Sequence, residues 1–569
     1  MRRLLVLIFL AVLLLPNHAG SEELSGKELY ESQLNKGIKN SDAYSYILIK
    51  KAQKDKAGSN RLLNQAAEFS PDLPAVYFEL SKNSLSPSYD GIMNSFNYFV
   101  QGINSYLRNF WWSFTISGIF FYSLVFSFIL ALLLLIIIRL PGDISLISHD
   151  IRENYSRILI LLGLIPLSII SPLLLLAGIL ILIGIYMRKR DSIIVYFFLL
   201  CLVFSPLLFK AAAFFVSTPS SGSMKSIVQT NESRGNSYAI SLLKNNKEYD
   251  ALFTYALALK REKRYDEAIE VYNELLKIRP SPAVYVNLGN CYVGLYNFND
   301  EMKYNLQEAE KHYLTAISMQ PSASAYYNLS QVSREMFDFT KGDEYFKAAV
   351  LLNRDALVMY RNIYGRTPGR LVADETIGFY ELWNYSIEKI KKVSSFGIIV
   401  GPPWLLSVIS AVLSALFFMM CRKLKYTAYK CRRCNTVLCG KCEKHLMWGQ
   451  MCPQCYRSLV KLDELDTKER VARLLRLYDL QKRRRDIMKI LSFIIPGSAQ
   501  IYSGKMLTGF AYMWLFLFFV IAPFMISIIV TDNMLLSHEF FKWAAITLAV
   551  VLYLIINFIT RQRISKGWL

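Results

Sequence analysis

The sequence predicts a mainly α-helical protein that crosses a membrane several times and carries a helical-repeat domain and a small cysteine-rich finger. Three observations support this fold class. Apolar runs long enough to cross a bilayer occur in several parts of the chain. A helix-pair pattern recurs in the middle of the sequence, and three Cys-x2-Cys pairs lie within 25 residues of one another.

The composition excludes two broad classes of protein. The 569 residues are 53% hydrophobic and 19% charged, whereas soluble globular proteins average about 25% charged residues. A wholly soluble cytosolic enzyme is excluded because the apolar residues are gathered in long runs. A disordered chain is excluded because it would not carry this much apolar surface.

The start of the chain has the features of an export signal. Two arginines at 2–3 form a basic start, residues 4–15 an apolar stretch too short for an ordinary span, and 19–21 a cleavage site of small residues. We expect a signal peptide at 1–21, although an uncleaved signal anchor would give the same topology. The polar segment 22–108, which has helical periodicity, should then lie outside the cytoplasm.

A first transmembrane region is expected over residues 109–216. Its first span covers residues 110–138, and Trp111 and Trp112 are expected at its outer edge as interfacial aromatic residues. A short loop is expected to follow at residues 140–157.

The apolar stretch 158–187 allows two arrangements. It contains Pro166 and Pro172 and is long for one span but short for two, so a steep single helix and a tight hairpin both fit. The basic residues 188–190 favour the hairpin, because only a hairpin returns them to the cytoplasm. The region thus has three or four spans, and the last of them, 192–216, leads outward.

The remainder of the chain alternates between hydrophilic and apolar segments. The hydrophilic segment 217–395 precedes a transmembrane helix at 396–421. A C-terminal membrane module is expected at 491–560, with two spans at about 509–530 and 541–559.

The net charge of +21 is concentrated between membrane segments. Residues 422–508 contain 20 Lys and Arg residues against 7 acidic ones. Because cytoplasmic loops of membrane proteins carry an excess of Lys and Arg, the topology accounts for this charge and no nucleic-acid partner is expected.

The middle segment contains three tandem copies of a helix-pair pattern. In this pattern small residues let two helices approach, aromatic residues fill the gap and a proline ends the second helix. The first copy has Ala268, Tyr272, Leu275 and Pro280; the second has Tyr285, Leu288, Gly289 and Tyr292, then an eight-residue insertion around 299–306, then Ala309, Tyr313, Ala316 and Pro321; the third has Tyr326, Leu329, Ser330, Gly342, Phe346 and Ala349, with Arg354 in place of the final proline. Residues 249–354 therefore resemble the tetratricopeptide-repeat (TPR) family.

The resemblance implies a concave surface that binds a protein or peptide. The binding side chains would lie on the inner faces of the first helices, but the pattern does not identify them. Residues 75–81 are similar to residues 283–289, so one or two degenerate helix pairs are expected before the first span.

Six of the nine cysteines form three closely spaced pairs, which predict a structural zinc finger at residues 430–456. A Cys-x2-Cys turn directs two thiolates at one cation, and two such turns complete a tetrahedron. The segment resembles small bacterial zinc-ribbon and B-box-like fingers. The candidate ligands are Cys431, Cys434, Cys439, Cys442, Cys452 and Cys455.

The number of zinc ions stays open. One four-thiolate site with a partial second site is possible, and in a cross-braced finger the first and third pairs would share one ion. His445 is either a ligand or a surface histidine. An iron–sulfur cluster and disulfides are the alternatives, but disulfides would require an exported finger, and the basic residues place it in the cytoplasm.

Residues 457–490 are expected to form a basic amphipathic helix. Its basic cluster lies at 482–485, and its apolar positions are Leu465, Val471, Leu474, Leu475, Leu477 and Ile487. Such a helix could lie on anionic membrane lipid; a solvated linker with charges that hold the topology is the other interpretation.

The segment 493–505 resembles the Pro-Gly-x-Gly-Gln-x-Tyr-x-Gly motif of small two-span bacterial membrane modules. Pro496, Gly497 and Gln500 match it, whereas Ser498 and Ala499 stand where the motif has a spacer and a glycine. Pro and Gly at a membrane boundary break a helix where polar neighbours satisfy the backbone. The resemblance therefore implies a location more than an activity.

The sequence favours a membrane scaffold or adaptor over an enzyme or a transporter. No Walker loop, GxSxG or HExxH motif is present, and ionisable residues are rare within the expected spans. The predicted partners are a protein or peptide on the repeats and membrane lipid, and a small-molecule substrate is not expected. We expect a bacterial inner-membrane protein that is not an enzyme, with periplasmic repeats and a cytoplasmic zinc finger; a membrane transport component or an enzyme without a known motif is the alternative.

Overall fold

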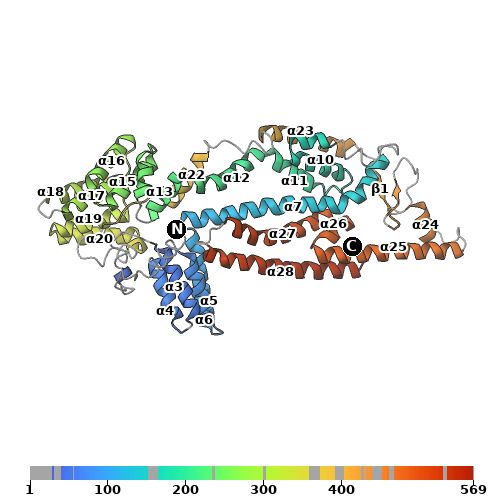
Figure 1. Cartoon of the computed structure of the whole chain (residues 1–569), viewed down its shortest axis with the longest axis horizontal. Coiled ribbons are helices and arrows are strands. Elements are labelled where there is room, and N and C mark those ends of the chain that lie inside the picture. The colour runs from blue at the N-terminus through green and yellow to red at the C-terminus, as the bar shows by residue number, and fades with distance from the viewer. Residues whose placement is uncertain are drawn as a thin grey trace, which may run out of the picture. The chain divides into compact units, whose positions relative to one another are not determined.

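The computed structural model describes most of the chain, and its described residues form two compact units (Figure 1). The first unit comprises Met1–Arg108 and Ser221–Leu382, and the second comprises Asn109–Ser220 and Trp383–Leu569. The described residues are 28–30, 40–55, 57–150, 164–232, 237–298, 303–357, 372–390, 403–423, 428–431, 433–438, 452–459, 467–529 and 535–567. The predicted signal peptide at 1–21 lies outside them. The fold is mainly α-helical, as the sequence predicts.

The segment before the first span forms two successive helix pairs. They are α3 (Asp42–Lys54) with α4 (Ser59–Phe69), and α5 (Pro74–Ser84) with α6 (Tyr89–Tyr106). Gly102 allows α6 to approach α5 closely, because a Cβ atom there would lie 2.7 Å from the Phe78 ring. Two pairs are the upper number that the sequence predicts for this segment.

The repeat segment of the first unit consists of four helix pairs. They are α13 (Gly222–Glu232) and α14 (Ser237–Lys244), α15 (Tyr249–Arg261) and α16 (Tyr265–Ile278), α17 (Pro282–Phe298) and α18 (Lys303–Met319), and α19 (Ala323–Glu335) and α20 (Phe339–Leu352). The first pair was not predicted. The other three coincide with the predicted repeats, and α22 (Phe379–Ile390) follows them.

The small and aromatic residues of the repeat pattern occupy the core between paired helices. Ala268 and Tyr272 are fully buried, as are Ala309 and Tyr313. A Cβ atom at Gly289 would lie 2.6 Å from the Tyr313 ring, so α17 and α18 are in close contact there. The insertion in the second repeat lengthens its helices: α17 and α18 each have 17 residues, whereas α19 has 13 and α20 has 14.

Among the described residues of the second unit, four helices are long and apolar enough to cross a membrane. They run over Phe110–His149 within α7 (Phe110–Asp150), Pro403–Arg422 within α23 (Pro403–Lys423), Met506–Ile529, which is α27, and His538–Ser565 within α28 (Leu535–Ser565). A further span is formed if α11 (Ile193–Val203) and α12 (Ser205–Ser220), which are bent by 65°, are counted together. The bend is explained by Pro206, which cannot continue the hydrogen-bond ladder of α11. In Figure 1, α7, α27 and α28 lie side by side.

The prediction of a loop at 140–157 is wrong for residues 140–150, the part of this range that the structure describes. Helix α7 continues through Pro141 to Asp150. One turn of helix at this point is held by Arg139, whose guanidinium makes two hydrogen bonds to the carboxylate of Asp143 at 2.9 and 2.7 Å. An i,i+4 ion pair of this kind stabilises a helix.

The stretch 164–187 folds back on itself. Helix α9 (Ile165–Ile170) and helix α10 (Pro172–Gly184) meet at Ser171. A Cβ atom at Gly178 would lie 3.0 Å from Leu167 and 3.1 Å from Leu164. Because residues 11 positions apart in one straight helix would be about 16 Å apart, these contacts exclude a single straight helix over the described residues.

Trp112 differs from its predicted place at a lipid-facing edge. Its side chain is buried within the second unit and packs beside the His538 ring at 5.5 Å. Packing against α28 thus removes this tryptophan from the outer surface, whereas its neighbour Trp111 is half-buried.

The C-terminal module is built around a close contact of two glycines. Gly497, with φ +91°, precedes α26 (Ser498–Ser503), and a Cβ atom on it would lie 2.2 Å from the carbonyl oxygen of Gly509 in α27. A Cβ atom at Gly509 would lie 2.5 Å from the carbonyl oxygen of Gly497. The tight backbone approach therefore exists although Ala499 replaces the second motif glycine.

The long helix predicted after the finger is present, but it is not amphipathic. Helix α25 runs over Thr467–Ile494. Its apolar side chains change face along the helix: Val471, Leu475 and Tyr478 lie on one side, whereas Leu480 and Ile487 fall about half a turn away from them. A continuous apolar stripe therefore does not form.

Candidate functional site: a repeat groove and a cysteine centre

The inner faces of the repeat helices hold a segment of the same chain. Residues 372–378, which we call the internal segment, adopt neither helix nor strand. They contact the first helix of each pair, that is α13, α15, α17 and α19. We call the surface that these four helices present to the segment the repeat groove.

Three asparagine side chains hold the main chain of the internal segment. Each amide group donates one hydrogen bond to a backbone carbonyl and accepts one from the N–H of the same residue. The pairs are Asn328 with Ala373 (2.9 and 2.6 Å), Asn287 with Glu375 (2.9 and 2.9 Å) and Asn231 with Ile377 (2.8 and 2.8 Å). Every second residue is held, which matches the side-to-side alternation of an extended chain.

A fourth asparagine orients this ladder. The Oδ1 atom of Asn290 accepts hydrogen bonds from the Tyr313 hydroxyl at 2.7 Å and from Asn328 Nδ2 at 2.9 Å. Its Nδ2 atom donates to the Ala373 carbonyl and to the Asp374 carboxylate, both at 3.0 Å. The repeat core, through Tyr313, thus fixes the direction of the groups that contact the segment.

The groove binds one side chain of the segment through charge. The carboxylate of Asp374 lies 2.5 Å from Lys260 Nζ and 3.4 Å from Arg261 Nε. All three side chains are at most 14% exposed. Burial alone would raise the pKa of Asp374, but the two cations and the hydrogen bonds from Lys260 and Asn290 together hold that pKa below its ordinary value.

The neighbouring carboxyl group is in a different environment. Glu375 accepts a hydrogen bond from the Ser324 hydroxyl, and burial together with the nearby charge of Asp374 raises its pKa.

The apolar side chains of the segment are buried: Ala373 packs with Tyr327, Ala349 and Leu357, and Val372 joins the cluster around Tyr313 and Leu329. Thr376 points to solvent.

The resemblance to the TPR family implied binding side chains on the inner faces of the first helices, and the contacts to the internal segment come from first helices. The resemblance did not identify these residues. A signal was present in the sequence: Tyr-x-Asn-Leu occurs at 285–288 and again at 326–329. The repeated asparagines, Asn287 and Asn328, occupy the same position in the second and third repeats.

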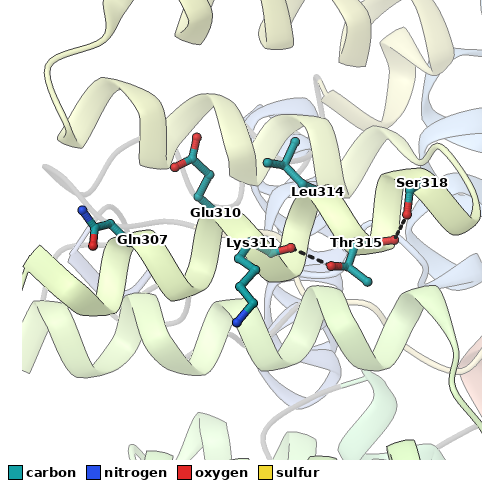
Figure 2. Close-up of a pocket in the computed structure, with 6 residues that line it drawn as sticks. All are labelled: Gln307, Glu310, Lys311, Leu314, Thr315 and Ser318. Carbon is teal, nitrogen blue, oxygen red and sulfur yellow. Dashed lines mark hydrogen bonds between the residues drawn. The ribbon is translucent and has the colours of Figure 1, made fainter.

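A shallow hollow on the second repeat does not direct its polar groups as a ligand-binding site would. It has a volume of about 390 Å³ and is lined by a row of side chains from α18 alone: Gln307, Glu310, Lys311, Leu314, Thr315 and Ser318 (Figure 2). The hydroxyls of Thr315 and Ser318 donate to carbonyls of their own helix at 2.8 Å each. The polar groups of the hollow are therefore directed to the helix rather than to a ligand.

The first and third cysteine pairs come together in the second unit. The sulfur atoms of Cys431, Cys434, Cys452 and Cys455 all lie within 4.8 Å of one another. The first pair lies on the loop of a hairpin formed by β1 (Tyr429–Lys430) and β2 (Val437–Leu438), and the third pair lies at the start of α24 (Pro453–Leu459). Cys439, Cys442 and His445 lie outside the described residues.

The four sulfur atoms suit one tetrahedral metal ion. A Zn–S distance of about 2.3 Å places sulfur ligands about 3.8 Å apart, and Cys434 Sγ lies 3.5 Å from Cys452 Sγ. Burial would raise the pKa of Cys431, but hydrogen bonds from the backbone at Cys434, Cys452 and Arg433 outweigh it and lower this pKa to about 7. The cluster thus has the donor set and the grouping that a metal needs, as the cross-braced arrangement requires.

The finger contacts the end of α7. Ala428 and Val437 pack with Leu146 and Tyr186, and Lys430 donates a hydrogen bond to the carbonyl of Gly142. On its other side the cysteine cluster packs against Leu477 of α25. The finger is therefore attached to two long helices of the second unit.

Comparison with known proteins identifies the repeats. Models described as tetratricopeptide repeat match residues 249–282 and 323–355. The chain is 35% identical over 95 residues to the mitochondrial import receptor subunit TOM70 of Saccharomyces cerevisiae, from strains YJM789 and S288c, and this match covers 15% of the chain. The chain spans only 15% of the length of that relative. The TPR prediction is thus confirmed for the repeat segment.

Proposed function

We propose that this protein is an integral-membrane adaptor that recruits a polypeptide through its TPR groove. The observation that carries the proposal is the asparagine ladder, in which amide side chains hold every second residue of an extended main chain. Such contacts read the backbone and so accept many sequences, as when an extended peptide adds to a sheet edge. The groove offers binding chemistry rather than a catalytic constellation.

The proposed topology places the repeats on the exported side and the finger in the cytoplasm. The basic residues 188–190 and 422–425 support it. Geometry within the second unit supports it too, because Trp383 packs with Phe114 near the start of α7, whereas the finger packs with Leu146 near its end. At ~1.5 Å per residue these points are roughly 48 Å apart, which exceeds the ~30 Å hydrocarbon layer.

The proposed role of the cysteine centre is to hold a structural zinc ion. Four thiolates complete a tetrahedron and leave no open position for a substrate, as in structural zinc sites. The two short strands and the seven-residue helix around it bury little apolar surface by themselves. Metal binding would therefore supply much of the free energy that folds the finger.

The name of the matched relative also supports the proposed role. TOM70 is named as a subunit of an import receptor, and a receptor for polypeptides at a membrane is the role we propose here. The bacterial inner membrane is proposed from the export signal and the charge pattern of this chain.

Site-specific photocrosslinking in membranes tests the function. A photoreactive phenylalanine analogue at Gln331, which lies on α19 one turn after the groove residue Asn328 and is half-buried, should crosslink to a discrete polypeptide. The same analogue at Leu314, in the hollow of α18, is the matched control and should not. The adaptor function is wrong if neither position crosslinks to any polypeptide.

A further inference from the structure

We propose that the internal segment is a built-in competitor for the repeat groove, and that the external ligand is an extended peptide segment with an acidic residue at the position of Asp374. This inference rests on the proposed adaptor function and specifies its ligand. The segment occupies the contacts that an incoming peptide needs, so the ligand must displace it.

The backbone contacts define the shape of the ligand. The asparagine pairs at Ala373, Glu375 and Ile377 use both the N–H and the carbonyl of each residue. A proline at any of these three positions would remove an N–H donor. An external ligand must therefore be extended over at least five residues and have no proline at alternate positions.

The side-chain contacts define its chemistry. Lys260 and Arg261 are two largely buried cations that converge on one carboxylate. A ligand without an acid at this position would remove the carboxylate that both cations share, which is strongly unfavourable in a buried site. An acidic residue is thus a requirement at the position of Asp374 and not at that of Thr376, which faces solvent.

The residues on either side of the acid add further selectivity. Ala373 is fully buried between Tyr327, Ala349 and Leu357, so a small side chain is favoured immediately before the acid. Ile377, which is also buried, favours an apolar side chain three positions after it. The pattern is therefore a small residue, an acidic residue, a residue other than proline, any residue and an apolar residue.

The helices of the groove also make contacts with one another that do not involve the segment. The helices that form the groove pack against one another in sequence, α15 with α16 and α17, and α17 with α18 and α19. The direction of Asn290 is set by Tyr313, which belongs to the repeat core. Removal of the segment would therefore leave a formed groove, and an external peptide can take its place.

Peptide binding to the full-length chain in detergent tests the inference. The probe is a fluorescent peptide with the sequence of residues 370–380, measured by anisotropy. Glu375→Pro removes the N–H that donates to Asn287 and weakens the internal segment without altering the groove. This variant should bind the peptide at least about tenfold more tightly than the unaltered chain.

Two controls match this variant. Thr376→Pro places a proline at the neighbouring residue, whose N–H does not donate to the asparagine ladder, and should bind like the unaltered chain. In the probe, Asp→Asn at the position of Asp374 should reduce affinity at least about tenfold, whereas Thr→Ala at the position of Thr376 should not. If Glu375→Pro lowers the helix content, Asp374→Asn in the chain is the second variant and should also increase binding.

The inference is overturned if the unaltered chain, Glu375→Pro and Asp374→Asn all bind the peptide with equal affinity. It is distinguishable from failure of the proposed function. A crosslinked partner at Gln331 together with equal peptide binding would retain the adaptor and remove the competitor. Tighter peptide binding by Glu375→Pro without any crosslinked partner would retain the competitor and remove the adaptor.

Discussion

The side-chain amide of Asn328 and the backbone of Ala373 exchange two hydrogen bonds, at 2.9 and 2.6 Å, across 45 positions of sequence. Both residues are fully buried. Asn328 is thus one of the three asparagines that hold the internal segment in the repeat groove. Because the loss of one partner leaves buried polar groups unsatisfied, this contact can be tested by substitution.

Asn287→Ala should weaken the attachment of the internal segment by about 2 kcal/mol, because two backbone groups of Glu375 lose their partner. Hydrogen exchange of the segment in the full-length chain should accelerate roughly 30-fold. Asn273→Ala, on the exposed side of α16, is the matched control and should change exchange little. Unchanged exchange in Asn287→Ala would contradict the ladder.

Asp374 and Glu375 should respond to pH in opposite directions. The pKa of Asp374 is lowered in the folded state, so its stabilising effect is present above its ordinary pKa of 3.8 and is lost as the pH falls further. Asp374→Asn should therefore lower the melting temperature near neutral pH, with a destabilisation of about 3 kcal/mol. The difference from the unaltered chain should shrink below about pH 4.

Glu375→Gln tests the other half of this contrast. The pKa of Glu375 is raised from 4.5 by burial, so its ionised form is disfavoured in the folded state and stability falls as the pH rises through that pKa. The substitution should leave the melting temperature unchanged or raise it at neutral pH. Circular dichroism of the full-length chain measures both variants, and a large loss of stability in Glu375→Gln would refute the assignment.

Cys452→Ser should release one zinc ion per chain, because the sulfur atoms of the first and third pairs form one group. Metal analysis of the reduced full-length protein measures the loss, and Cys201→Ser in α11 is the control that should retain zinc. Cys439→Ser separates the two stoichiometries: the loss of a further ion indicates a second site. Retention of all metal in Cys452→Ser would exclude this centre.

Gly497→Ala and Gly504→Ala form a matched pair in the C-terminal module. Both glycines have φ near +90°, but a Cβ atom at Gly497 would meet the Gly509 carbonyl at 2.2 Å, whereas one at Gly504 has no neighbour within 4 Å. Gly504→Ala should cost about 1–2 kcal/mol from backbone strain alone. Gly497→Ala should cost more than about 3 kcal/mol, visible as a much lower steady-state level in membranes; equal levels would contradict the contact.

Alkaline phosphatase fusions test the topology in a bacterial host. A fusion after Ala356 should be active because the repeats are proposed to lie outside, and a fusion after Leu459 should be inactive because the finger is proposed to lie inside. The reverse pattern would exclude the four-span arrangement of the first membrane region.

The repeats could be predicted from the sequence because their signal is local and periodic. Ala268, Tyr272 and Tyr313 are buried as the pattern requires. The internal segment could not be predicted, because its partners are far away in sequence: Asn231 contacts Ile377 across 146 positions, and residues 372–378 form no periodic element. The repeated asparagines can be recognised in the sequence, but the internal segment that they contact cannot.

Other differences between sequence and structure have equally specific causes. A loop was expected from residue 140, but the ion pair between Arg139 and Asp143 and the packing of Leu146 on the finger accompany a continuous helix. The cysteine spacing predicted a metal centre without choosing between pairings, because connectivity depends on the fold of the hairpin and of α24. Ala499 stands where the motif has a glycine, and a close backbone approach is made by Gly497 and Gly509.

The covalent link between the groove and the internal segment has a consequence for the concentrations at which the groove would respond. A tethered competitor acts at an effective concentration on the order of millimolar, whatever the abundance of the protein. A free peptide of equal affinity at micromolar concentration would then occupy roughly one groove in a thousand. Stray extended peptides would be ignored, and occupancy would require a much tighter ligand or one gathered at high local density on the same membrane surface.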